Sequence, residues 1–176
     1  MSNTTLQHLS DAVRNIPDYP KPGILFKDVT PLMKDPALFS EVLDQLAERL
    51  KPYHADYILG VEARGFIFGA ALADRLKIGF IPIRKKGKLP AKTHAYSYAL
   101  EYGIDTIEIH QDAIEPHHRV IILDDLLATG GTAAATAELV KLVGAELVGY
   151  GFVIELDFLN GRHLLGDVPI ESLLHY

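Results

Sequence analysis

The residues with the clearest chemistry lie between positions 120 and 132 of this 176-residue chain. Two acids, Asp124 and Asp125, follow an apolar run, and Ala128-Thr129-Gly130-Gly131-Thr132 comes shortly after them. Glycines let a ligand approach the backbone closely, and consecutive N–H groups at the start of a helix attract an anion. The stretch has neither the Gly-Lys-Ser/Thr of a nucleotide-triphosphate loop nor a GxGxxG turn. It therefore predicts a site for a phosphate monoester, with the threonine hydroxyls as further donors.

The two aspartates are expected at the carboxyl end of a buried strand, where open α/β sheets bind their ligands. A ribose whose phosphate is held by the loop would place its vicinal hydroxyls near Asp124 and Asp125, which can accept hydrogen bonds. The alternative is that the aspartates only cap a strand and that Gly130 and Gly131 only make a turn. The joint pattern of strand, paired acids and Thr-Gly-Gly-Thr favours a sugar-phosphate site.

Alternating strands and helices are expected to position these residues. The runs 57–61, 79–83 and 120–123 are apolar throughout, which is typical of strands buried on both faces of a parallel sheet. Helical stretches are expected at 66–76 and 132–143, and a further strand at 147–154. This order predicts an α/β fold with crossover helices.

The ends of this central pattern are less regular. Apolar residues at helical spacing, Leu6 to Ile16, predict an N-terminal helix that a run of prolines then stops. Asp35 and Pro36 are typical of a cap and a first helical residue, and they predict a second helix reaching Leu50. Residues 84–103 break the pattern and predict a long loop or a hairpin, which in a compact domain is usually functional.

Composition limits the class of protein. A net charge of -6 argues against a nucleic-acid coat protein or a membrane-surface binder, and 48% hydrophobic residues suffice for one core. The chain has no cysteine and no run that predicts a membrane span or a signal sequence, so we expect a single cytoplasmic domain over residues 1–176. The eight histidines show no spacing typical of a metal site.

The segment 120–132 resembles the phosphoribosyl-binding motif of the type I phosphoribosyltransferase family. Further segments narrow the resemblance to the adenine-specific branch over nearly the whole chain: residues 17–28, 60–66 (Gly-Val-Glu-Ala-Arg-Gly-Phe), 83–90 and 97–103. The resemblance implies a central, mainly parallel sheet flanked by helices. It also implies an N-terminal helix and base-binding hood over residues 1–35 and a flexible catalytic loop over 84–105.

By this resemblance the chain transfers the sugar of PRPP (5-phosphoribosyl 1-pyrophosphate) to adenine, giving AMP and pyrophosphate, in a Mg²⁺-dependent reaction. Asp124 and Asp125 would stabilise positive charge at C1 and contact the metal through water. Glu101 would exchange a proton with purine N7. A lone glutamate in a loop is otherwise simply solvated, and that alternative stays open.

The resemblance also implies a pyrophosphate site made of Ala63, Arg64, Arg84, Lys85 and Lys88, with a non-proline cis peptide between Ala63 and Arg64. It implies that Arg84 reaches the active site of a neighbouring subunit, so a homodimer is expected. The alternatives are a helix-capping or surface role for Arg64 and a solvated loop for the cation cluster.

Adenine is expected to contact Leu25, Phe26, Lys27 and Arg64, with the Phe26 ring stacked on the base and the Leu25 backbone bonded to its edge. The alternative places Phe26 in the core. Two rival functions remain at this point: a phosphoribosyltransferase for another base, and a regulator that only senses PRPP. The Leu25-Phe26 hood argues against the first, and the chain's length and acidity argue against the second.

Overall fold

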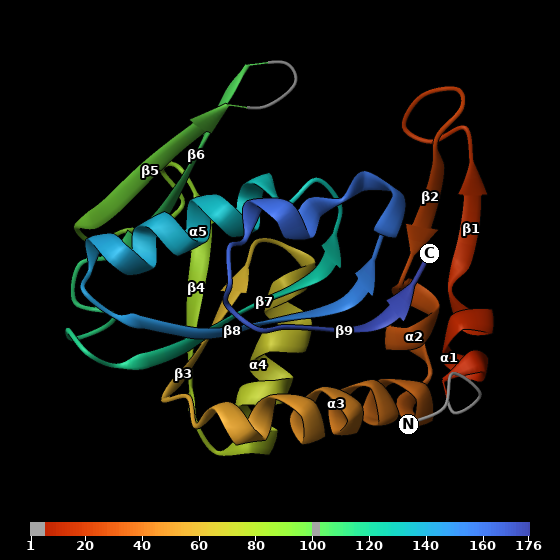
Figure 1. The fold of residues 1–176 in the computed structure, drawn as a ribbon, viewed down its shortest axis with the longest axis horizontal. Helices are drawn as coiled ribbons and strands as arrows, with labels where there is room; N and C mark the ends of the chain where they lie inside the picture. Colours follow the sequence, from red (N-terminus) through yellow and green to blue (C-terminus); the bar gives the residue numbers. More distant parts are fainter. Residues whose placement is uncertain (1–5, 100–102) are drawn as a thin grey trace.

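The computed structural model describes residues 6–99 and 103–176, which form a seven-stranded sheet with helices on both faces and a separate two-stranded hairpin (Figure 1). The strand order is β5-β6-β4-β3-β7-β8-β9. Five of these strands are mutually parallel: β3 (Tyr57–Val61), β4 (Gly79–Lys85), β7 (Arg119–Leu127), β8 (Glu146–Glu155) and β9 (Ile170–His175). The expected mainly parallel α/β architecture is confirmed.

The parallel strands contain apolar central runs because the sheet lies between two layers of helices. Ile121 and Leu123 pack with α3 (Pro36–Leu50) and α4 (Arg64–Leu76) on one face of the sheet. Val120 and Ile122 pack on the opposite face, with α5 (Gly131–Leu142). Figure 1 shows α5 on one side of the sheet and α3 and α4 on the other. A period-two pattern of polar residues is absent from β7 for this reason.

The second predicted helix is confirmed as α3. Oδ1 of Asp35 accepts hydrogen bonds from the N–H groups of Ala37 and Leu38 at 2.9 and 3.1 Å, and Pro36 is the first helical residue. Proline is favoured there because its missing N–H would have no partner in the helix. The Asp35 cap thus determines where α3 begins after the N-terminal region.

The N-terminal helix is shorter than expected. It covers α1 (Gln7–Ala12), and Ile16, predicted as helical, lies on β1 (Arg14–Pro17) opposite Phe26 of β2 (Leu25–Asp28). That part of the prediction was wrong because pairing with β2 supplies backbone hydrogen bonds that local periodicity does not reveal. A short α2 (Thr30–Lys34) follows.

Of the two alternatives predicted for residues 84–103, the structure favours the hairpin, although its second strand lies beyond the predicted segment. β5 (Thr93–Ala99) pairs antiparallel with β6 (Ile104–His110), and β6 pairs antiparallel with the end of β4. In Figure 1 this hairpin and the β1–β2 hairpin project at opposite ends of the view. Three short 3₁₀ helices complete the described chain: η1 (Lys51–Tyr53), η2 (Asp157–Leu159) and η3 (Gly161–Leu164). Within residues 6–99 and 103–176, every helix is too short or too polar to cross a membrane.

Candidate active site

The paired aspartates lie on β7 near the carboxyl edge of the sheet. β7 pairs with β3 as far as Leu123, opposite Gly60, and with β8 as far as Leu127. Asp124 and Asp125 therefore lie beyond the pairing with β3 but inside the strand. They lie near the carboxyl end of the strand, as expected, although the ladder with β8 extends β7 to Leu127, beyond the predicted run 120–123.

Asp125 is joined to Arg64, the first residue of α4, by a 2.5 Å hydrogen bond from Arg64 Nε to Asp125 Oδ2. Asp125 is only 5% exposed, so the arginine supplies the positive charge that a buried carboxylate needs. The two elements approach closely at Gly65, where a Cβ atom would lie 2.9 Å from Oδ1 of Asp124. A larger residue at position 65 would push Asp124 out of place.

The surroundings of Asp124 and Arg64 shift the pKa values of both side chains. Burial and the neighbouring Asp125 raise the pKa of Asp124 well above its usual range. Burial opposes the charge of Arg64, but its bond to Asp125 and the nearby carboxylates outweigh that effect and raise its pKa. Arg64 therefore stays positive, whereas burial and the neighbouring Asp125 disfavour the charged form of Asp124.

The predicted phosphate loop lies directly between β7 and α5. It begins after Leu127, and Gly130 has a φ of +85°, which a side chain would disfavour. No side chain among the described residues caps the start of α5 at Gly130, so the helix presents its first N–H groups to a ligand. Oγ1 of Thr132 lies 3.1 Å from the hydroxyl of Tyr98 on β5. The predicted order of strand, aspartates and glycine turn is confirmed. That the turn binds a phosphate stays a prediction.

Arg84 lies on β4 and is held by the turn that follows β3. Its Nε and Nη2 donate to Glu62 at 3.3 and 3.2 Å, and Nη1 donates to the carbonyl of Lys88 at 3.0 Å. Glu62 also accepts from the Lys85 N–H at 2.9 Å. The Arg84 bond lowers the pKa of Glu62 against the opposing effect of burial. The turn after β3 therefore brings Arg64, the first residue of α4, near Arg84, which Glu62 holds.

The remaining expected pyrophosphate residues are more exposed. Nζ of Lys85 lies 3.3 Å from Asp105, and Lys88 is exposed. Ala63 is the N-cap of α4. The cis peptide joins Glu62 to Ala63, one bond earlier than the resemblance implied between Ala63 and Arg64. The position of the cis bond is corrected accordingly.

Phe26 faces this site from the N-terminal hairpin. Its ring centroid lies 5.9 Å from the guanidinium carbon of Arg64, and Tyr19 contacts it edge-on at 5.2 Å between centroids. Phe26 is half-buried, so it does not belong to the closed core. The structure thus brings together Phe26, Arg64 and Asp125, which are far apart in the sequence.

Leu25 and Lys27 alternate with Phe26 along β2 and point away from it. Leu25 is 49% exposed. Nζ of Lys27 donates to Asn15 at 2.7 Å and lies 3.8 Å from the centroid of the Tyr176 ring. The Lys27 ammonium is therefore engaged on the opposite side of the hairpin from Arg64.

Glu101 lies outside the described residues. Its flanking strands are paired up to Ala99 and Ile104, at the tip of the β5–β6 hairpin. Its expected acid–base role stays a prediction.

Several residues of the site were not predicted. Glu62 and Asp28 lie within segments that carry the family resemblance, and an acid inside such a segment is the signal that could have identified them. Asp28 accepts two hydrogen bonds from Arg14 at 2.9 and 2.6 Å, which anchors the hairpin that carries Phe26. Gly161 contacts the phosphate loop from the far end of the chain, and no local pattern marks it.

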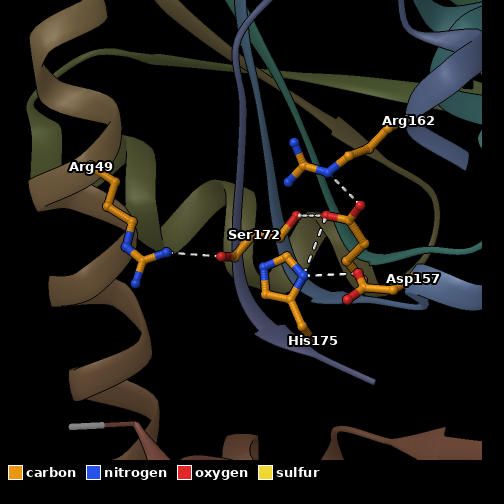
Figure 2. A network of polar contacts seen from close by, with 6 residues as sticks. Arg49, Asp157, Arg162, Ser172 and His175 are labelled. Carbon is orange, nitrogen blue, oxygen red and sulfur yellow. Dashed lines mark hydrogen bonds and ion pairs between the residues drawn. The ribbon is translucent and has the colours of Figure 1, made fainter. Parts of the chain in front are cut away.

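A second polar network lies near the carboxyl end of β8 (Figure 2). Glu155, Asp157 and His175 place potential metal-ligand atoms within 4.8 Å of one another. However, Oε1 of Glu155 is paired with Arg162, and Oε2 accepts from Ser172 at 2.6 Å. Both oxygens are engaged by protein donors, so we assign the cluster to a structural network.

Comparison with known proteins agrees with this geometry. Residues 32–159 match the phosphoribosyl transferase domain family. The adenine phosphoribosyltransferase of Nostoc punctiforme is 56% identical over 170 residues, covering 96% of this chain and 99% of the relative. The crystal structure of adenine phosphoribosyltransferase from Thermoanaerobacter pseudethanolicus is similar with a TM-score of 0.95 and 50% identity, covering 98% of this chain and 100% of the other.

A third relative was crystallised with ligands. The Saccharomyces cerevisiae adenine phosphoribosyltransferase, in complex with an imino-altritol bisphosphate and adenine, is similar with a TM-score of 0.91 and 44% identity. The match covers 98% of this chain and 99% of the yeast chain. The chain thus belongs to the type I phosphoribosyltransferase family, within its adenine phosphoribosyltransferase branch.

Proposed function

We propose that the site around Asp124, Asp125 and Arg64 transfers the 5-phosphoribosyl group of PRPP to adenine, giving AMP and pyrophosphate in purine salvage. The observation that carries the proposal is the arrangement at the end of β7. Paired carboxylates lead into an anion-binding turn, and Arg64 bonds directly to one of them. Sugar hydroxyls, a phosphate and a second anion would thus find partners at one edge of the sheet.

The phosphoribosyl group binds along β7 and the following turn. The 5-phosphate accepts hydrogen bonds from the start of α5 and its loop, formed by Ala128, Thr129, Gly130, Gly131 and Thr132. Asp124 and Asp125 accept from the ribose hydroxyls, and their charge stabilises the positive charge that develops at C1 as pyrophosphate leaves. Because Asp125 is buried and fixed by Arg64, its carboxylate needs no reorganisation during the reaction.

The pyrophosphate group binds beside β3 and β4 to Ala63 (through its backbone), Arg64, Lys85 and Lys88, with Arg84 supplied by the neighbouring subunit. A guanidinium binds phosphate oxygens in a planar fork, which a single charge cannot reproduce. Asp125 orients Arg64, and Glu62 orients Arg84. Each arginine is thus preorganised by a carboxylate.

Adenine binds against the hood. Phe26 stacks on the base, the Leu25 backbone bonds to its edge, and Arg64 closes the side towards the sugar. Lys27 contributes through its backbone, since its ammonium is engaged with Asn15 and Tyr176. Glu101 of the loop exchanges the proton at N7.

The paired aspartates suit Mg²⁺, which prefers hard oxygen ligands and keeps several waters. Asp124 and Asp125 place two carboxylates next to each other in the chain, and burial together with the neighbouring Asp125 raises the pKa of Asp124, so a bound cation would favour its charged form. We propose that both hold the metal through water. Bound there, Mg²⁺ supplies positive charge that stabilises the departing pyrophosphate.

We further propose that residues 1–176 act as one catalytic unit, with 1–35 as the hood and 84–105 as the loop, and that two such units form a homodimer in the cytoplasm. Arg84 is the residue expected to act across the dimer boundary.

The decisive experiment incubates the protein with PRPP, Mg²⁺ and one nucleobase at a time, and detects nucleotide and pyrophosphate by chromatography. AMP is expected with adenine, and chelation of Mg²⁺ should abolish it. PRPP binding without release of pyrophosphate would instead indicate a sensor. Equal yields with hypoxanthine would indicate a different base specificity.

A further inference from the structure

The phosphate loop is in backbone contact with a segment far along the chain. A Cβ atom on Gly130 would lie 2.5 Å from the carbonyl oxygen of Gly161. A Cβ atom on Gly161 would overlap the carbonyl of Ala128 and lie 3.0 Å from the Gly130 nitrogen. The backbones around Gly130 and Gly161 are therefore too close for any side chain at either position. The position of Gly161 therefore determines where the loop can lie.

The segment 157–164, which carries Gly161, is poorly anchored by apolar packing. Its only buried residue is Gly161, whereas Phe158 is 73% and Leu164 is 60% exposed. Burial of apolar surface is what normally fixes a loop. Leu165, which directly follows the segment, is buried in the core and fixes its far end, so polar contacts are needed mainly to hold the part around Gly161.

The polar anchor closest to Gly161 is an ion pair between Arg162 and Glu155 (Figure 2), while the start of the segment is held by the Asp157 N–H, which donates to the Tyr176 carbonyl at 2.9 Å. Glu155 is the last residue of β8 and is only 3% exposed. It pairs in the sheet with Leu127, the residue that directly precedes the phosphate loop. Arg162 directly follows Gly161. The ion pair thus connects the residue next to Gly161 with the strand next to the loop.

Glu155 is itself held from the other side. Its Oε2 accepts a 2.6 Å hydrogen bond from Ser172 on β9, and the Ser172 carbonyl accepts from Arg49 of α3 at 2.8 Å. Figure 2 shows the two arginines on opposite sides of β9. Without Arg162, the buried carboxylate would keep only the more distant His175 ring, at 4.0 Å, as an ion-pair partner, and buried charges with poor partners are strongly disfavoured.

We propose that Glu155 and Arg162 are positioning residues for phosphoribosyl binding: their ion pair holds Gly161 against Ala128 and Gly130, so that the loop keeps the geometry that binds the 5-phosphate. The inference rests on the proposed assignment of residues 128–132 to that phosphate. The affinity for the phosphate then depends also on the Glu155–Arg162 network, which does not contact the ligand.

The test is calorimetric titration of the full chain with ribose 5-phosphate and, separately, with pyrophosphate and Mg²⁺. Arg162→Met should raise the Kd for ribose 5-phosphate about tenfold, which corresponds to about 1.4 kcal/mol. The Kd for pyrophosphate should not change, because Arg64 and Arg84 are held by other carboxylates. Arg162→Lys should restore part of the affinity, since it keeps the charge but not the fork.

Arg49→Met is the matched control, because Arg49 bonds to the same Ser172 but does not contact segment 157–164. It should leave both affinities unchanged even where it lowers the melting temperature. If Arg162→Met does not fold, Glu155→Gln makes the same comparison with a side chain of equal size.

Wild-type affinity for ribose 5-phosphate in the Arg162 variants would overturn the inference, as would an equal loss in Arg49→Met or an equal loss of pyrophosphate binding. Thr132→Val separates this result from failure of the proposed function. If Thr132→Val weakens ribose 5-phosphate binding and Arg162→Met does not, only the positioning role is wrong. If neither variant has an effect, the phosphate assignment of the loop is wrong as well.

Discussion

Nε of Arg64 donates a 2.5 Å hydrogen bond to Oδ2 of Asp125, and this bond joins the first turn of α4 to β7. Within the described ranges, the bond engages Nε alone, and neither terminal nitrogen of the guanidinium has a hydrogen-bond partner. The side chain of Arg64 is 43% exposed, whereas that of Asp125 is 8% exposed. The buried acid therefore orients an arginine whose two outer nitrogens remain available to an anion.

Replacing Arg64 with methionine should lower kcat/KM for PRPP roughly 10²-fold, the usual effect of removing one preorganised donor to a developing charge. Arg75→Met is the control, because Arg75 lies near the other end of α4 and bonds to Ser40 and Asp44 of α3. Steady-state kinetics with adenine saturating measure both. Similar rates for the two variants would remove Arg64 from the site.

The two glycines of the phosphate loop should respond differently to alanine. Gly130→Ala should destabilise the fold by roughly 1–3 kcal/mol or more, because its φ is +85° and Gly161 leaves no room. At Gly131 the nearest atom to a Cβ would be 3.9 Å away, on Tyr98. Gly131→Ala should thus fold normally and lose PRPP affinity. Thermal unfolding and calorimetry distinguish the two effects, and full PRPP affinity in Gly131→Ala would contradict the loop's role.

Phe26→Leu should raise the KM for adenine about tenfold, the usual scale of base stacking, and leave that for PRPP unchanged. Lys27→Met should change either constant much less, because its ammonium faces Asn15 and Tyr176.

We also expect wild-type protein to prefer adenine over hypoxanthine by up to about 10⁴-fold, because acceptors for the 6-amino group would be left unpaired by a 6-oxo group. Equal kcat/KM for the two bases would contradict the proposed hood.

A mixing experiment tests whether Arg84 acts across a dimer. Arg84→Ala and Asp125→Asn should each be nearly inactive alone. If Arg84 serves the partner's site, a mixed dimer contains one site with both residues intact, so mixing after mild dissociation should restore activity. Light scattering should show a dimer throughout. An active monomer, or mixtures as inactive as the parent variants, would assign Arg84 to its own subunit.

Elements with local signals were predictable from the sequence. β3 has its predicted bounds because its apolar run is bordered by polar residues, and α3 begins at Pro36 because Asp35 caps it. The order of strand, paired aspartates and glycine turn is equally local. These features depend on neighbours within a few residues, which a single sequence displays directly.

Features that depend on distant contacts were not predictable. Ile16 has helical spacing but lies on a strand because it meets Phe26. β7 continues through Asp124 and Asp125 because β8 pairs with it as far as Glu155. The contact of Gly161 with Gly130 likewise follows from the tertiary fold. In each case a contact between two distant segments determined the local structure, and the residue pattern of neither segment predicts that contact.

The last prediction contrasts Glu101 with the two aspartates. Glu101→Leu should lower kcat by about 10² to 10⁴-fold, the usual contribution of a positioned acid or base, with little change in PRPP binding. Asp124→Asn and Asp125→Asn should raise the KM for PRPP and lower kcat together, because they remove ribose contacts and charge stabilisation at C1. Asp125→Asn should have the further effect of weakening pyrophosphate binding, since Arg64 loses its charged partner. Steady-state kinetics with adenine saturating and PRPP varied compare the three variants. If Glu101→Leu keeps near wild-type kcat, or shows the same pattern as the aspartates, the N7 proton is exchanged with water and Glu101 is only a solvated loop residue.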